Sequence, residues 1–303
     1  MSMPPLTPQC PDWATALCNG FSQIFLQRHP VCGVFCLLAI LVSAPTLLAG
    51  ALLGAASGLL TAQRRGYAKA ERQAGLYSYN GALLGLLLSH QLPWSALLPL
   101  LIIACAGLSS ILIQQWLKRT RHTPVLMAYT APFVGLGWIV LYFTANPAPA
   151  APLDSTLNSL TLVLALFKGV GQVMLLQHPL AGLLIVIGVW LSNWRAALWA
   201  LAGSLTGLLF GLWQQEPGDA LSGLSGYNPV LAALALSHQS QRPWLPVLGI
   251  LLTLLLLPVF SALGLPPLTA PFILGCWLVQ ATLRALWPKP LEAKEQCRLR
   301  IER

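Results

Sequence analysis

The stretch GLYSYNGALLGLLLSHQ (75–91) recurs later in the chain as GLSGYNPVLAALALSHQ (223–239). Both copies keep a Tyr–Asn pair at the start of an apolar run and a Ser–His–Gln triplet at its end. Two further blocks recur in the same order: SQIFLQRHPVCG (22–33) as GQVMLLQHPLAG (171–182), and TAPFVGLGW (130–138) as TAPFILGCW (269–277). Three matches in one order indicate that the chain consists of two homologous halves.

The composition places these halves in a membrane. Of the 303 residues, 56% are apolar and only 8% are charged, and the mean hydropathy is +0.70. A soluble domain carries roughly 25% charged residues, so this chain has too few charges to cover a surface in water. The net charge of +9 lies mostly in loops and at the C-terminal end. The positive-inside rule accounts for such clusters, so no nucleic-acid partner is expected.

We therefore expect an all-α polytopic membrane protein with about ten transmembrane helices and two re-entrant pore helices around a central pore. The re-entrant segments are expected at 15–28 and 160–177, which are short and interrupted. The expected spans are 31–44, 46–62, 75–89, 93–117, 124–143, 180–192, 195–213, 223–238, 243–260 and 268–287. The expected domains are a first repeat at 1–145, a Pro/Ala-rich linker at 146–156, a second repeat at 157–288 and a basic tail at 289–303.

The charges of equivalent loops indicate that the two repeats are inverted in the membrane. The loop 63–72 carries four bases and one acid, whereas its counterpart 214–222 carries two acids and no base. The loop 118–122 is basic, whereas its counterpart 261–267 has no charge. Equivalent loops of opposite bias belong on opposite sides of a membrane. With five crossings in each half, both termini face the cytoplasm.

The chemistry expected inside the membrane is neutral. Each of the eight acidic residues falls in an expected loop, linker or tail, whereas ion-coupled carriers usually need ionisable groups inside the bundle. The sequence contains no spacing typical of a metal site and no nucleophile–base pattern, so we expect neither catalytic residues, nor a metal, nor a cofactor, and the protein is not expected to be an enzyme. An uncharged polar substrate moving down its gradient fits this composition.

Three pairs of polar residues at matched positions are the candidate pore residues. A buried amide without a partner costs a few kcal/mol, so the recurrence of such groups implies a purpose. Asparagine and threonine at these positions could instead cap helices, and the glutamines could be solvated helix ends. The pairs are Gln23 with Gln172, Asn80 with Asn228, and Thr130 with Thr269.

Four histidines also form repeat-related pairs, His29 with His178 and His90 with His238. Paired pore histidines would suit an ammonia or ammonium channel. All four lie beside Pro or Gln at expected helix ends, which is typical of interfacial turn residues. The ammonia channel and an ion-coupled carrier of a small amide are therefore the alternative functions.

Together, the three block pairs resemble the urea transporter family in its compact bacterial form. The YNPVLAALAL and LPPLTAPF stretches carry the most specific part of the likeness, which extends over roughly residues 15–287. The resemblance implies facilitated, uncoupled passage of urea through a homotrimer with one pore per subunit. It also implies a multi-pass protein of the bacterial inner (plasma) membrane.

The resemblance further implies a role for each candidate residue. The glutamine and asparagine pairs would lie near the two mouths, and Thr130 and Thr269 would lie at the central constriction. Aromatic walls of a narrow slot would come from Phe25, Tyr79 and Tyr227, beside a ladder of oxygens that accepts the N–H groups of urea. Met174 stands where the first half has Phe25, and Tyr replaces the Phe expected before both asparagines.

Overall fold

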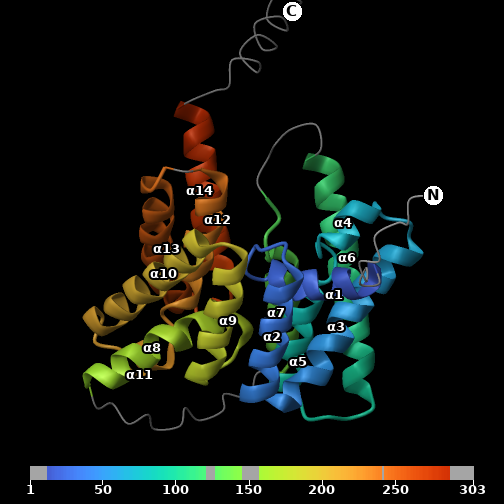
Figure 1. Cartoon of the computed structure of the whole chain (residues 1–303), viewed down its shortest axis with the longest axis horizontal. Coiled ribbons are helices and arrows are strands. Elements are labelled where there is room, and N and C mark those ends of the chain that lie inside the picture. Colours follow the sequence, from blue (N-terminus) through green and yellow to red (C-terminus); the bar gives the residue numbers. More distant parts are fainter. Residues whose placement is uncertain (1–11, 121–126, 145–156, 241, 287–303) are drawn as a thin grey trace, which may run out of the picture.

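The computed structural model describes residues 12–120, 127–144, 157–240 and 242–286 (Figure 1). These residues form helices joined by short turns and contain no β-strand. The expected linker at 146–156 and the basic tail at 289–303 lie outside the described residues.

Seven of the described helices precede residue 145. They are α1 (Asp12–Gln23), α2 (Pro30–Ser43), α3 (Pro45–Arg64), α4 (Lys69–Gln73), α5 (Tyr79–Gln91), α6 (Leu97–Thr120) and α7 (Ala131–Thr144). The later residues form α8 (Ser159–Gly171), the 3₁₀ turn η1 (Gln172–Met174), α9 (Pro179–Ser192), α10 (Trp194–Trp213), α11 (Pro217–Ser222), α12 (Tyr227–Gln239), α13 (Trp244–Ala262) and α14 (Ala270–Leu286). Helices from matching sequence blocks have matching lengths: α2 and α9 have 14 residues, α3 and α10 have 20, and α5 and α12 have 13.

Four of the described helices are long and apolar enough to cross a membrane by length and composition, namely α3, α6, α10 and α13. A fifth candidate is the pair formed by α8 with η1 and α9, which is bent by 76° at its break. The helices α2, α7 and α14 are apolar but shorter. At about 1.5 Å per residue, a 13-residue helix such as α5 covers only about 20 Å, less than the roughly 30 Å of a bilayer core.

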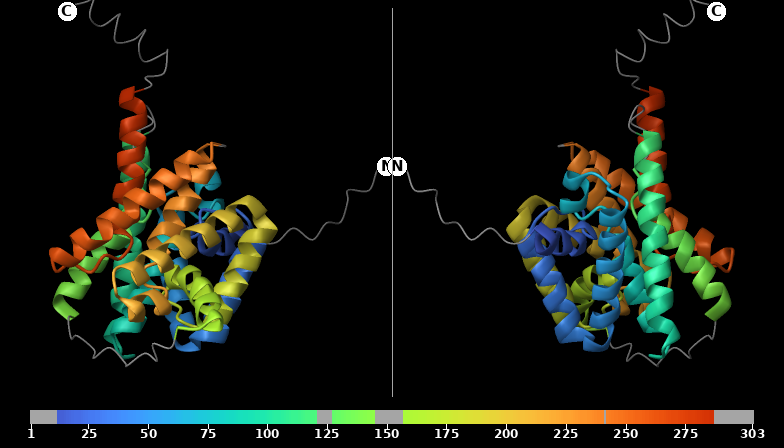
Figure 2. Two further views of the ribbon diagram at one scale, coloured as in Figure 1. Left: turned by 90° about the vertical axis from the view of Figure 1, so that its left-hand side faces the viewer. Right: turned by 90° about the vertical axis from the view of Figure 1, so that its right-hand side faces the viewer.

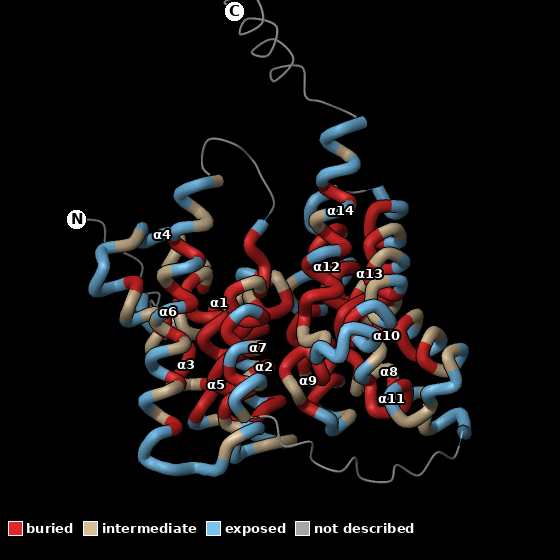
Figure 3. The backbone as a smooth tube through the Cα atoms, turned by 180° about the vertical axis from the view of Figure 1, so that it is seen from behind, coloured by how far each residue is buried: buried red, intermediate tan, exposed pale blue. Residues whose placement is uncertain are grey.

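The outer faces of these helices are apolar, as contact with lipid requires. Buried residues follow the inner helix faces, whereas the outer faces are exposed (Figure 3). Large apolar side chains are among the most exposed, including Leu97, Leu100, Phe143, Trp213 and Leu255. A surface with this many exposed apolar side chains is typical of contact with a membrane or a partner.

The parts of the chain before and after residue 145 meet through α2 and α9, which pack side by side (Figure 2). The helices α7 and α14 also touch. Close packing within each part depends on glycine at matched positions. A Cβ on Gly33 would lie 1.9 Å from the carbonyl oxygen of Cys18, and one on Gly182 would lie 1.8 Å from that of Phe167. Only glycine therefore allows α1 to contact α2, and α8 to contact α9, at this distance.

The structure differs from the sequence-based expectation in two helix starts and in the placement of three acids. The expected span 75–89 begins later, as α5, because residues around Gly75 form turns before Tyr79. The expected span 124–143 is described as helix only from Ala131. Three acids expected in loops or tails lie in helices, since Asp12 begins α1, Glu71 is in α4 and Asp219 is in α11.

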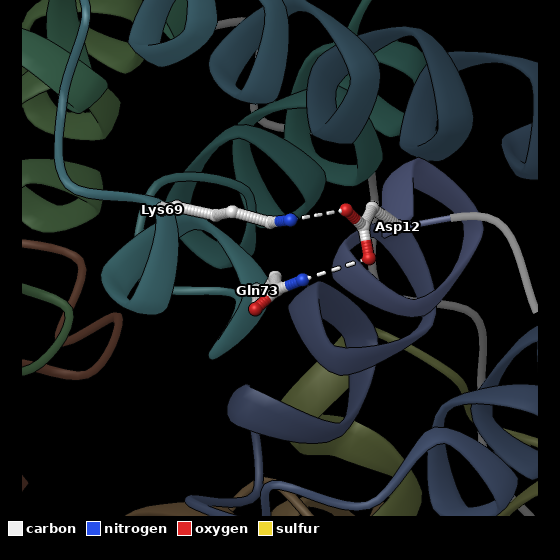
Figure 4. A network of polar contacts seen from close by, with 3 residues as sticks. All are labelled: Asp12, Lys69 and Gln73. Atoms are coloured by element: carbon white, nitrogen blue, oxygen red, sulfur yellow. Dashed lines mark hydrogen bonds and ion pairs between the residues drawn. The ribbon is translucent and has the colours of Figure 1, made fainter. Parts of the chain in front are cut away.

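Asp12 joins α1 to α4 at the surface (Figure 4). The Lys69 ammonium lies 2.6 Å from the Asp12 carboxylate, and the Gln73 amide donates to the other oxygen of that carboxylate at 2.9 Å. The hydrogen bond and charge of Lys69 hold the pKa of Asp12 below its usual range. Both charged side chains are well exposed, so this contact orients α4 more than it stabilises the fold.

Candidate functional site

The candidate site is centred on two threonines brought together from distant parts of the chain. Thr130 immediately precedes α7, and Thr269 immediately precedes α14. Their hydroxyl oxygens lie 2.7 Å apart, and their side chains are 4% and 3% exposed. The two matched TAPF blocks therefore meet in space.

The backbone before each threonine is unusual in the same way. Tyr129 has φ of +43° and Leu268 has φ of +41°, values that residues other than glycine rarely adopt. Such a conformation costs of order 1–3 kcal/mol and persists only where surrounding contacts impose it. Its occurrence at both positions indicates that the turns aiming the two threonines at each other are imposed by the tertiary fold.

Asn80 and Asn228 cap helices other than their own. Asn80 lies in the first turn of α5, and its Oδ1 accepts a hydrogen bond from the backbone N–H of Phe133, in the first turn of α7, at 3.2 Å. Asn228 of α12 does the same for Phe272 of α14, also at 3.2 Å, and its amide donates to the carbonyl of Leu268 at 2.9 Å. First-turn N–H groups have no partner inside their own helix, so each asparagine fixes the start of a neighbouring helix beside a threonine.

The four candidate wall residues are all buried. Phe25 and Met174 are fully buried in the turns that follow α1 and α8. Tyr79 is hydrogen bonded through its hydroxyl to the carbonyl oxygen of Tyr129, which ties α5 to the turn before Thr130. Tyr227, its counterpart, lines a cavity of about 750 Å³ together with Leu268. The two tyrosines therefore have different surroundings.

The two glutamines also differ. Gln172 is buried in η1, and its amide donates to the carbonyl of Ser222 at 3.1 Å. Gln23 ends α1, and its Oε1 is buried without a hydrogen-bond partner among the described residues. An unpaired buried acceptor costs about 1–3 kcal/mol, so Gln23 presents a free acceptor where Gln172 is tied to the backbone.

The paired histidines have different surroundings. His178 begins the turn into α9, where its Nδ1 accepts from the backbone N–H of Leu180 at 3.3 Å. His238 lies 2.8 Å from the Leu234 carbonyl through Nδ1. Its Nε2 lies 3.4 Å from the amide nitrogen of Gln27, so His238 also contacts the first half of the chain. The Nδ1 of His29 is buried without a hydrogen-bond partner among the described residues.

Sequence reasoning missed four polar residues: Gln27 in the turn between α1 and α2, Tyr129 before α7, Gln239 at the end of α12 and Gln280 in α14. Gln27 accepts from the hydroxyl of Ser192 at 3.1 Å, across the α2–α9 contact. The Tyr129 hydroxyl accepts from both other glutamines. A single amide inside an apolar helix, as at Gln280, is the signal that could have revealed this group.

No Asp, Glu, Lys, Arg or His is fully buried among the described residues, and the buried polar side chains there are Asn, Gln, Ser, Thr and Tyr. The starts of α7 and α14 meet at the threonine pair. Helix N-termini carry partial positive charge, so this point disfavours cations and accommodates neutral polar groups. The fold and site together define an all-helical membrane protein with an uncharged polar centre.

Comparison with known proteins shows to which family of membrane proteins this chain belongs. The sequence model described as "Urea transporter" matches residues 14–284. Urea transporter 1 of Rattus norvegicus is 28% identical over 248 residues, which cover 77% of this chain and 64% of the rat protein. Urea transporter 1 of Ovis aries is 28% identical over 296 residues, covering 89% of this chain and 77% of the sheep protein. The chain therefore belongs to the urea transporter family, although it spans less than two thirds of the length of the rat relative.

Proposed function

We propose that the protein lets urea cross the membrane passively through a narrow path that passes Thr130 and Thr269. The observation that most directly supports this proposal is the pair of facing threonine hydroxyls, 2.7 Å apart. They lie in a core whose described buried polar groups are all neutral. Urea is planar and uncharged, with four N–H donors and one strong acceptor. Hydroxyl groups can both donate and accept, so the threonines offer urea partners without binding a cation. The family membership supports urea as the substrate.

The other candidate residues follow from this path. Gln23, Gln172, Asn80 and Asn228 supply acceptors toward its two ends, and Phe25, Met174, Tyr79 and Tyr227 supply its walls. The free Oε1 of Gln23 supports this assignment. The path works as a conduit only if each hydrogen bond to the substrate is favourable but weak enough to release it.

The proposed architecture is two inverted repeats, at 1–145 and 157–288, each with five crossings and one re-entrant segment. The position of matched helices supports it: α4 lies near the edge of the molecule where α6 and α14 end, whereas α11 lies near the opposite edge (Figure 1). The first edge carries bases, including Lys69, Lys118 and Arg284. By the positive-inside rule we assign that edge to the cytoplasm of a bacterial inner membrane, with both termini on it. A homotrimer is proposed from the family resemblance.

Urea entry into proteoliposomes tests the function directly. The purified protein should accelerate urea entry over protein-free vesicles, with no effect of an imposed sodium or proton gradient. Entry of labelled methylammonium without urea would instead support the ammonia channel. Dependence of urea entry on either gradient would support an ion-coupled carrier.

A further inference from the structure

A hydrogen-bonded cluster lies beside the threonine pair, on one side only. The phenol oxygen of Tyr129 accepts from the amide of Gln239 at 2.7 Å and from the amide of Gln280 at 2.8 Å. Gln239 ends α12 and is exposed, whereas Tyr129 and Gln280 are buried. Tyr129 therefore lies between an exposed residue and the central threonines.

The same positions in the other half are built differently. The sequence repeat matches Tyr129 with Leu268, Gln280 with Leu141 and Gln239 with Gln91. All three counterparts line the cavity of about 750 Å³. That cavity also includes Glu216 and Asp219, which places it toward the edge opposite the basic one. We call the Leu268 side, which carries this cavity, the open end. We call the Tyr129 side, where the phenol is hydrogen bonded to two amides, the closed end.

The contacts of Tyr129 resemble those that urea would make. Each glutamine presents a primary amide NH₂ group to the phenol oxygen, and urea carries two such groups. The phenol oxygen is the acceptor in both hydrogen bonds. A urea molecule that displaces one glutamine amide therefore replaces its hydrogen bond with an equivalent one.

From this asymmetry we infer that Tyr129, held by Gln239 and Gln280, is the residue that selects for unsubstituted amides at the closed end of the path. The inference rests on the proposed function and adds a specificity position to it. A substrate with a free NH₂ group exchanges with a glutamine at the phenol oxygen. Methylation of both nitrogens leaves no NH₂ group and adds volume against a ring that Phe272 contacts edge-on, at 5.0 Å between centroids.

The test compares urea with N,N′-dimethylurea, which has no NH₂ group, in stopped-flow measurements on proteoliposomes. Tyr129→Leu copies the open end, and we expect it to raise the ratio of N,N′-dimethylurea to urea permeability about tenfold, the factor that corresponds to one substrate hydrogen bond. Tyr129→Phe keeps the ring and removes the oxygen, so it should slow urea about tenfold and leave N,N′-dimethylurea slow. Tyr142→Leu, on the exposed outer face of α7, is the matched control and should change neither flux.

An unchanged permeability ratio in folded Tyr129→Leu protein overturns the inference. If that variant does not fold, Gln280→Leu, which copies Leu141, should raise the ratio, and an unchanged ratio there overturns it equally. Absence of urea flux in the wild-type protein refutes the proposed function instead. In that event the osmotic water permeability of the proteoliposomes is measured instead. If Tyr129 closes the path, Tyr129→Leu should raise this permeability several-fold. An unchanged permeability overturns the inference that Tyr129 closes the path.

Discussion

Replacing Thr130 and Thr269 together by valine tests the centre of the proposed path. Valine has nearly the shape of threonine, so the change removes two hydroxyls and leaves the volume almost intact. Each hydroxyl is buried, and it can bind the passing substrate only by giving up its hydrogen bond to the other hydroxyl. If each contributes one hydrogen bond of about 1 kcal/mol to urea at the constriction, the double variant loses about 2 kcal/mol, or roughly 30-fold in urea flux.

The stability of the variants provides a separate check on the pair. Thr130→Val alone leaves the buried Thr269 hydroxyl without its partner, which costs about 1–3 kcal/mol. The double variant removes both partners, so it should be no less stable than either single variant in thermal unfolding. An additive loss of stability would show that the two hydroxyls do not depend on each other.

The flux assay is stopped-flow light scattering of proteoliposomes at matched protein content. Thr253→Val is the control, because Thr253 is fully buried in α13 and its hydroxyl has no hydrogen-bond partner among the described residues. That variant should keep wild-type flux. Wild-type flux in the Thr130→Val, Thr269→Val double variant would remove the threonines from the path.

Three further predictions concern the frame around the path. Asn80→Ala removes the acceptor for a first-turn N–H of α7 and should lower the free energy of unfolding by about 1–3 kcal/mol, measured by thermal unfolding in detergent. Gly33→Ala places a methyl group 1.9 Å from a backbone oxygen of α1 and should abolish the folded yield, whereas Gly135→Ala, with open space around it, should not. Asp12→Asn removes the ion pair with Lys69. Because the pKa of Asp12 is lowered in the folded state, the stability that the ion pair provides is present above about pH 4 and is lost below that pH. That loss should be small and should vanish in high salt, and a large, salt-independent change would contradict the surface character of the pair.

Much of the fold could be predicted because its signals are local. Long apolar runs predicted helices in a membrane, and ten of the described helices fall on the expected spans, from α2 in the first half to α14 in the second. The start of α5 was misplaced, since the turns around Gly75 depend on contacts with Asn19 and Gly20 rather than on the apolar run itself. Family membership was also predicted correctly from the repeated blocks.

The site was predictable in its members but not in its connections. Recurrence in two halves singled out Thr130, Asn80 and their counterparts, because a polar residue that returns at a matched position in an apolar run is costly to keep. The expectation left open whether each asparagine caps its own helix. The structure instead places the caps on α7 and α14, across 53 and 44 residues of sequence.

The sequence by itself determined that the chain is helical and apolar outside, that two sets of polar residues recur, and that few charges are available to its interior. The tertiary structure alone decided that the two threonines touch and that the residues before them have different surroundings, since Tyr129 is hydrogen bonded to Gln239 and Gln280 whereas Leu268 lines a cavity. The reason is physical. Helix formation and membrane burial follow from neighbouring residues, whereas a hydrogen bond between residues more than a hundred positions apart follows from how helices cross.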